Sequence, residues 1–338
     1  MDDETSRRRV PTIDQVAALA GVSRATVSRA FTRPEMLSEA TVQRVKAIAR
    51  DVGYVPNQVA RALSTGRHGN LALIVPDVAN PFFPPLIRGA QLRADEAGFC
   101  VFLGNSDEQA GREDMLVGRF TSQVEGMILV SSRLDEERIR LYAERRPIVL
   151  VNRDVAGIPR VLIDSATGII AALAHLIDHG HRRIVYVSGP SASWSNQQRR
   201  LALRREAAKR GVEIVAVPAR PPTYEAGYAA TAQILASKAT AALAFDDLVA
   251  QGLLAGLAER GIDVPGRFSV VGCDDVLGTT TYPPLTTVSA RCKEAGQVAA
   301  DLLMDLLKVK AMRDVRYVLE SHLVVRGTTG PVAPPDRP

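Results

Sequence analysis

From residue 71 onward, short apolar runs alternate with helical stretches, and this alternation restricts the fold more than any other feature of the sequence. Such alternation is typical of an α/β fold built from doubly wound parallel sheets. A seam near "VLIDSATG", residues 161–168, divides the runs into two series, which predicts two lobes of similar size. The expected strands are "LALIVPD", "CVFLGNS", "GMILVSS" and "IVLVNRD", then "RIVYVSGP", "EIVAVPA", "AALAFDD" and "FSVVGCDD".

The first 55 residues follow a helical pattern instead. Thr12, Ser23 and Ser38 are good N-caps, and Gly21 and Gly53 are good helix stops. Only a short turn separates the first two helices, as a helix-turn-helix requires, so we expect a compact head of three small helices. The residues expected to face its interior are Val16, Leu19, Ala20, Val27, Ala30, Val42, Val45 and Ile48.

These patterns predict the domain boundaries. We expect a disordered N-terminus at 1–10, an all-α helix-turn-helix domain at 11–55, and a hinge helix with linker at 56–70. The α/β core then covers 71–328, and the tail at 329–338 is expected to be disordered. Within the core, lobe one is expected at about 71–164 with part of 290–328, and lobe two at about 165–289.

Positive charge is concentrated in the head. The chain carries a net charge of +5, and its first 70 residues hold 11 Lys and Arg against 7 Asp and Glu. Arg24 follows the N-cap Ser23, where the helix dipole is already positive, so this placement is unfavourable unless an anion lies in front of it. The head therefore reads as a module that binds a polyanion.

The cysteines and the apolar segments indicate the compartment. Cys100, Cys273 and Cys292 are far apart and form no C-x-x-C pair, so neither a disulfide framework nor a zinc site is expected. The amino terminus has no apolar signal region, and the longest apolar stretch, "GIIAALAHLI", is too short to span a membrane. We expect a cytoplasmic protein with no membrane partner.

Polar residues follow most of the expected strands. Because ligands of open α/β sheets bind beyond the carboxyl ends of the strands, a cleft between the lobes is expected to hold a small polar molecule. Any one of these residues could be polar only because its strand enters solvent there. The set is Asp77, Asn80, Asn105, Ser106, Ser131, Ser132, Asn152, Arg153, Ser188, Asp246, Asp247, Asp274 and Asp275.

Motifs for catalysis are missing. The sequence has no dinucleotide-binding or Walker loop, no serine-hydrolase elbow and no H-E-x-x-H, so we expect no catalytic residue and no cofactor. In "HLIDHGH", His175 and His179 are four residues apart and could bind a metal with a third ligand. We favour the structural interpretation, in which His179 and His181 lie at a helix C-terminus that attracts cations.

Five segments together resemble the LacI/GalR family of transcriptional regulators, from Thr12 to about Gly327. They are "TIDQVAALAGVSRATVSRAF", "YVPNQVARAL", "NPFF", "LIDHGHRRIVYVSGP", and "VGCDD" followed by "PPLTTVS". The resemblance implies a DNA-binding head, a hinge helix that orders on the operator, and a periplasmic-binding-protein-like core that binds an effector and dimerises. A homodimer is expected to read a near-palindromic operator.

The resemblance also implies roles in DNA binding. The helix after Ser23 would lie in the major groove, with Arg24 and Ala25 at the positions that most vary operator choice and Arg29 near a guanine or a phosphate. Thr26 and Ser28 are either phosphate contacts or plain helix surface. Leu63 would be a wedge in the minor groove. The full set implied is Thr12, Ser23, Arg24, Ala25, Thr26, Ser28, Arg29, Asn57, Ala60 and Leu63.

A second set is implied for the effector. Asp246 stands where the family more often has Asn, and this extra carboxylate argues against an anionic ligand; Cys273 replaces a common aromatic. We expect the effector to be a sugar or a polyol. We expect the protein to be a repressor. The two alternatives are a solute-binding protein without DNA activity and an α/β enzyme that acts on sugars. The set implied is Asn80, Phe82, Phe83, Asn105, Arg153, Trp194, Arg199, Asp246 and Asp274.

Overall fold

The computed structural model describes residues 11–55, 68–309 and 314–333. The chain divides into two compact units, residues 1–68 and 69–338. Asn57, Ala60 and Leu63 of the expected hinge lie outside the described residues. In the described part, no helix is both long and apolar enough to cross a bilayer.

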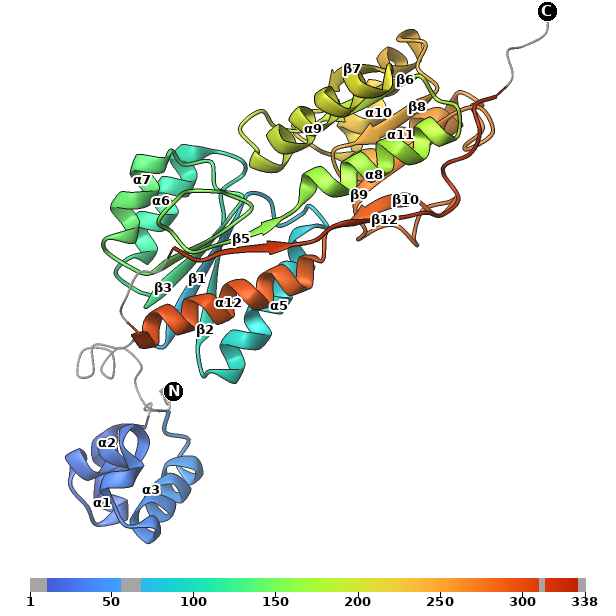
Figure 1. The fold of residues 1–338 in the computed structure, drawn as a ribbon. Helices are drawn as coiled ribbons and strands as arrows, with labels where there is room; N and C mark the ends of the chain where they lie inside the picture. Colours follow the sequence, from blue (N-terminus) through green and yellow to red (C-terminus); the bar gives the residue numbers. More distant parts are fainter. Residues whose placement is uncertain (1–10, 56–67, 310–313, 334–338) are drawn as a thin grey trace, which may run out of the picture. The chain divides into compact units, whose positions relative to one another are not determined.

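The head is a three-helix unit with a short 3-10 turn (Figure 1). Each helix begins where a hydroxyl side chain can accept a backbone N–H: Thr12 accepts from Gln15 at 3.4 Å, and Ser23 accepts from Thr26 at 3.1 Å. Ser38 starts the third helix in the same way. The elements are α1 (Ile13–Ala20), α2 (Arg24–Thr32), η1 (Pro34–Met36) and α3 (Glu39–Asp51).

The core of the head is small and aliphatic. Val16, Val27 and Val45 are completely buried, and alanines fill the space between them. The prediction that Leu19 faces inward is wrong, since its side chain is 58% exposed. The buried stripe of α1 is centred between Val16 and Ala17, and at about 100° per residue Leu19 lies more than a quarter turn from that centre.

Lobe one of the core is a parallel sheet in the order β11-β5-β4-β3-β1-β2. Helices α5 and α12 cover one face of the sheet, and α6 and α7 cover the other (Figure 1). The strands are β1 (Asn70–Val75), β2 (Cys100–Asn105), β3 (Gly126–Val130), β4 (Ile148–Val151), β5 (Arg160–Ile163) and β11 (Arg316–Leu319); the helices are α5 (Phe83–Glu96), α6 (Ala110–Phe120), α7 (Glu136–Ala143) and α12 (Cys292–Val309).

Lobe two repeats this architecture with the strand order β12-β10-β9-β8-β6-β7, in which only the β10–β12 pair is antiparallel. Helices α8 and α9 cover one face, and α10 and α11 the other. The strands are β6 (Arg183–Ser188), β7 (Glu213–Pro218), β8 (Ala241–Ala244), β9 (Ser269–Asp274), β10 (Thr286–Ser289) and β12 (His322–Val324); the helices are α8 (Ser165–Asp178), α9 (Trp194–Arg210), α10 (Tyr224–Ala236) and α11 (Asp247–Glu259).

The eight apolar runs coincide with β1–β4 and β6–β9. The seam at 161–168 is itself structured, because β5 ends lobe one there and α8 begins lobe two at Ser165. The chain crosses between the lobes again after β10 and after β11, so α12 and β11 return to lobe one (Figure 1). Both lobes thus end their parallel strands toward a shared cleft.

The expected disorder of the tail is wrong for residues 329–333, which pack against the end of α8. Val332 N–H donates to the carbonyl of His179 at 2.9 Å, and Gly330 N–H donates to the hydroxyl of Ser269 at 3.1 Å. The hydroxyl of Thr329 lies 2.9 Å from the ring of His175. Partners for the tail backbone, including a helix-end carbonyl, therefore hold residues 329–333 in place.

His179 and His181 lie at the C-terminal end of α8, as expected, but His181 is buried and its environment does not favour a cation. It is 1% exposed, with Nδ1 at 2.8 Å from the Thr240 hydroxyl and Nε2 at 3.1 Å from the Gly330 carbonyl. Burial lowers the pKa of His181, and burial also lowers the pKa of His175. Desolvation outweighs the attraction of the helix end for a cation. The described residues contain no group of His, Cys, Asp or Glu suited to a metal.

Acidification is expected to destabilise this corner of lobe two. Because the pKa of His181 lies below 6.5 in the folded protein, the unfolded chain binds more protons once the pH falls below that value. The stabilisation is complete above the unfolded pKa and is lost as the pH falls toward the folded one. Burial raises the pKa of Asp246, Asp247 and Asp274, so protonation of these carboxyls stabilises the folded protein on acidification, and the His181 effect must be measured as a difference between two proteins. Relative to His181→Gln, the thermal midpoint of wild type should fall from pH 7.5 to 5.5. The exposed His322→Gln is the control, and equal slopes in all three proteins would contradict this assignment.

Candidate functional site

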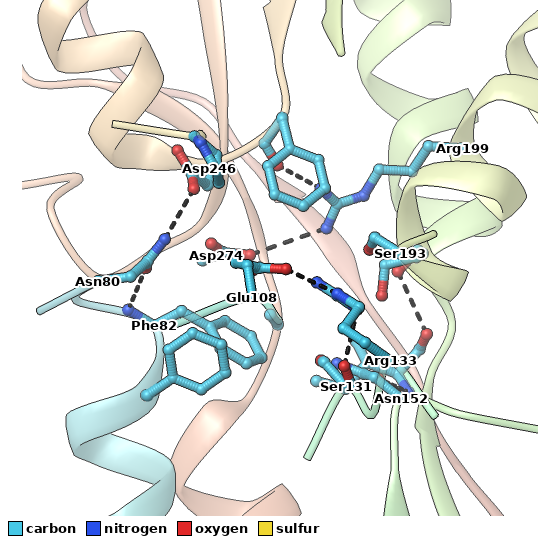
Figure 2. A pocket seen from close by; sticks show the side chains of 17 residues that line it. Asn80, Phe82, Glu108, Ser131, Arg133, Asn152, Ser193, Arg199, Asp246 and Asp274 are labelled. Carbon is cyan, nitrogen blue, oxygen red and sulfur yellow. Dashed lines mark hydrogen bonds and ion pairs between the residues drawn. The ribbon is translucent and has the colours of Figure 1, made fainter. Parts of the chain in front are cut away.

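A cleft opens at the carboxyl ends of the strands of both lobes (Figure 2). It encloses about 510 Å³ of empty space, part of it open to solvent. Its position is the one at which parallel α/β sheets bind ligands. The lining residues are Asn80, Phe82, Phe83, Glu108, Ser131, Arg133, Asn152, Ile163, Ser165, Ser193, Ser195, Arg199, Pro222, Phe245, Asp246, Asp274 and Ala290.

Six of the nine residues expected to bind an effector line this cleft: Asn80, Phe82, Phe83, Arg199, Asp246 and Asp274. Asn105, Arg153 and Trp194 are not among the lining residues, and their role in effector binding stays a prediction. The amide of Asn105 accepts from Val78 N–H at 3.0 Å, and Arg153 donates to the Leu134 carbonyl at 3.1 Å. Trp194 begins α9 between Ser193 and Ser195 in the sequence, and these two serines line the cleft.

Arg199 organises the lobe-two wall. Its side chain is 7% exposed and donates through Nη1 to the Phe245 carbonyl, with the guanidinium 5.3 Å from the centre of the Phe245 ring. Nη2 lies 3.7 Å from the carboxylate of Asp274 (Figure 2). Asp274 ends β9 with φ of 109°, a backbone conformation that is uncommon for a residue with a side chain. A buried cation and a buried carboxylate thus face one ligand space.

Burial dominates the electrostatics of this wall. It raises the pKa of Asp274 well above the usual value, while the Arg199 guanidinium partly offsets the shift. Burial also raises the pKa of Asp246 to about 6, and hydrogen bonds from Val249 N–H and Asn80 oppose that rise. The two carboxyls are therefore the groups of the cleft most sensitive to pH and to a ligand that donates hydrogen bonds.

Asp246 and Asn80 join the two lobes directly. The Asn80 amide donates to Asp246 Oδ2 at 2.9 Å, and Val249 N–H, in the first turn of α11, donates to Oδ1 at 2.8 Å. The Asn80 amide oxygen in turn accepts from Phe82 N–H at 2.9 Å. Asp246 was expected to accept from an effector hydroxyl, yet both its oxygens already accept within the protein. No hydrogen bond to the Asp274 carboxylate occurs among the described residues, so Asp274 is the freer acceptor.

The lobe-one wall contains residues that the sequence reasoning missed. Glu108 and Arg133 form an ion pair at 2.6 Å inside the cleft, and Arg133 also donates to the Ser131 carbonyl at 2.7 Å (Figure 2). Glu108 and Arg133 each lie three residues beyond the end of a strand, in "GNSDEQ" and "LVSSRLD". Ser131 and Asn152 were noted as polar strand ends. Extending the search a few residues past each strand would have found the pair.

The exposed face of α2 carries the residues expected to contact DNA. Ala25, Ser28 and Arg29 are exposed, and Arg29 forms no ion pair among the described residues. Arg24 is paired, because its Nε lies 3.0 Å from the carboxylate of Asp14 in α1. The anion next to Arg24 is thus Asp14 of the head itself, whereas the charge pattern had predicted an anion outside the protein. Of the remaining set, Thr12 and Ser23 are exposed helix caps and Thr26 is half-buried.

Two family profiles match the sequence. "Bacterial regulatory proteins, lacI family" matches residues 12–57, and "Periplasmic binding protein-like domain" matches residues 173–329. The HTH-type transcriptional repressor CytR of Escherichia coli K12 is 32% identical over 94% of this chain and 96% of its own. The HTH-type transcriptional regulator CelR of Thermobifida fusca is 34% identical over 95% and 98%.

Solved structures agree in fold. A lac repressor dimer bound to operator and the anti-inducer ONPF is 25% identical, with a TM-score of 0.85 over 95% of this chain and 100% of its own. A CelR–cellobiose complex is 32% identical, with a TM-score of 0.70 over 94% and 99%. A regulator from Enterococcus faecium with bound ribose is 26% identical, with a TM-score of 0.72 over 78% and 99%.

Proposed function

This chain belongs to the LacI family of bacterial regulatory proteins, and on that premise we propose that it is a dimeric transcriptional repressor controlled by a small carbohydrate. Residues 11–55 bind operator DNA, 56–70 form the hinge, and 71–328 bind the effector and dimerise. Such a regulator acts on chromosomal DNA, so the proposal places it in the cytoplasm. It is not an enzyme, as its relatives are regulators.

One observation carries the DNA-binding proposal: α2 presents an exposed polar face with Arg29, a cation that forms no ion pair with any residue the structure describes. A helix of nine residues with small neighbours such as Ala25 and Ser28 fits the major groove, where arginine donates two hydrogen bonds to guanine. The Ser23 cap fixes the start of the helix. In the proposed complex the first residues of α2 lie toward base edges, as in other helix-turn-helix proteins.

The chemistry of the cleft supports a neutral sugar or polyol. Carboxylate Asp274 accepts hydrogen bonds from hydroxyls and guanidinium Arg199 donates them, while Phe82, Phe83 and Phe245 offer apolar ring surface for the C–H faces of a sugar. Cellobiose and ribose in the two related structures are consistent with this class.

The proposal is tested by operator selection with the full-length protein from a random DNA library, followed by a thermal-shift screen of sugars and polyols. We expect a near-palindromic operator and at least one sugar that changes its affinity. A sugar at a hundredfold excess over its Kd should stabilise the protein by about 2.7 kcal/mol. Sugar binding with no sequence preference on DNA would favour a solute-binding protein and contradict the repressor.

Asp14→Asn is expected to raise operator affinity severalfold. Asp14 holds Arg24 at 3.0 Å and adds a negative charge near the DNA-facing end of α2, so removing that charge frees the guanidinium and lessens repulsion from phosphates. Stability should change little because both side chains are more than 60% exposed. Fluorescence anisotropy measures the effect, and Glu39→Gln, an exposed acid on α3, is the control. Unchanged or weaker binding by Asp14→Asn would show that Asp14 positions Arg24 for DNA instead.

A further inference from the structure

The lobe-one wall of the cleft contains a direct ion pair between Glu108 and Arg133. The Arg133 side chain is 7% exposed and that of Glu108 is 25% exposed, and Nε donates to Oε2 at 2.6 Å. Arg133 is fixed twice more, since Nη1 donates to the Ser131 carbonyl and the backbone N–H donates to buried Glu113, both at 2.7 Å. These anchors orient the guanidinium toward the cleft without any ligand (Figure 2).

The backbone fixes the partner as firmly. Glu108 has φ of 58° and Ser131 has φ of 48°, both in the left-handed region that non-glycine residues seldom adopt. Glu108 N–H donates to the Pro76 carbonyl at 3.1 Å, which anchors its loop to the end of β1. Left-handed residues of this kind persist only where the surroundings impose them, and they gather at ligand sites. The surrounding structure therefore holds the Glu108–Arg133 pair in a defined position in the cleft wall.

The charges of the cleft leave no cation free for an anion. Each arginine in the lining faces a carboxylate of its own lobe, Arg133 at Glu108 and Arg199 at Asp274. Asp246 adds a third carboxyl without a cation of its own. An anionic ligand would have to displace a carboxylate from an arginine, whereas a hydroxyl can accept from Nη2 of Arg133, which donates no hydrogen bond within the described residues.

We propose that Glu108 is a specificity residue that makes the cleft reject anionic sugars by occupying Arg133, while Arg133 donates to a neutral effector. The inference rests on the proposed carbohydrate function and assigns its charge selectivity to one carboxylate. Removing that carboxylate would leave a buried, prepositioned cation free to pair with the carboxylate or phosphate of a ligand.

Matched neutral and acidic sugars test the inference on the full-length protein by isothermal titration. The probes are glucose and glucuronate, galactose and galacturonate, and ribose and ribose 5-phosphate. We expect wild type to bind the neutral member of at least one pair tenfold or more tightly than the acidic member. Glu108→Gln should reduce that ratio at least tenfold, mainly by tighter binding of the acid.

Asp107→Asn is the matched control. Asp107 is the neighbour of Glu108 and also has a positive φ, but its carboxylate pairs with Arg112 and does not line the cleft. This substitution should leave the ratio unchanged. Glu108→Ala serves if the glutamine variant fails to fold. Sugar binding with an unchanged ratio in the Glu108 variants, or wild type preferring the acid, overturns the inference alone. If wild type binds no sugar in any screen, the carbohydrate proposal fails and the inference falls with it.

Discussion

Arg29→Ala is expected to weaken binding to the selected operator by about 1–3 kcal/mol, roughly 5- to 150-fold. Arg29 is exposed on α2 and forms no ion pair within the described residues, so its guanidinium is available to a base edge. The loss should be specific to sequence, because a bidentate contact with guanine has no equivalent on other bases. Anisotropy titrations with the selected duplex and a scrambled duplex, at several salt concentrations, measure the sequence-specific loss and the electrostatic loss of affinity.

Arg44→Ala is the control for charge alone. Arg44 is an exposed arginine on α3 of the same head, and its loss should affect both duplexes about equally. A contact of Arg29 with phosphate only would also weaken both duplexes alike and would lower the salt slope by about one unit. That outcome would contradict base reading by Arg29.

The head shows which parts of a structure can be predicted from sequence. The caps at Thr12, Ser23 and Ser38 act on backbone groups three residues away, so a local pattern was enough to predict them. The pair between Asp14 and Arg24 joins two helices, and only the packing angle brings them together. Local rules thus predicted the helices correctly but placed the counter-ion of Arg24 outside the protein.

The core shows the same division. Apolar runs predicted eight strands and missed the other four of the described residues, β5, β10, β11 and β12. The two last strands join different sheets, and β12 pairs with β10 in antiparallel orientation. Polar strand ends predicted a cleft and several of its lining residues. Glu108 and Arg133 lie beyond those ends in loops whose left-handed residues are neither glycine nor asparagine, so no sequence signal marks the turn. Irregular backbone was the part that sequence reasoning could not place.

Asp274→Asn is expected to weaken effector binding by about 1.5–3 kcal/mol, roughly 10- to 150-fold, and to remove the response of operator binding to the effector. The Asp274 carboxylate is 6% exposed, faces the cleft and accepts no hydrogen bond within the described residues. It can therefore accept a hydrogen bond from an effector hydroxyl. Asparagine has the same shape, but it accepts through one atom and removes the carboxylate that lies 3.7 Å from Nη2 of Arg199. Affinity for the operator alone should stay close to wild type.

The pH dependence of effector binding separates this role from a structural one. Burial raises the pKa of Asp274, and the ionised form is the better acceptor, so wild-type affinity should rise as the pH increases through that pKa. In Asp274→Asn, the only pH dependence of effector affinity that should remain is the one caused by ionisation of Asp246, which has a pKa of about 6. The control is Asp275→Asn, which breaks a 2.7 Å pair with Arg326 outside the cleft and should keep the wild-type profile. If Asp274→Asn is folded and retains both the affinity and the pH profile of wild type, then Asp274 only joins Arg199 within lobe two, and another group must accept from the effector.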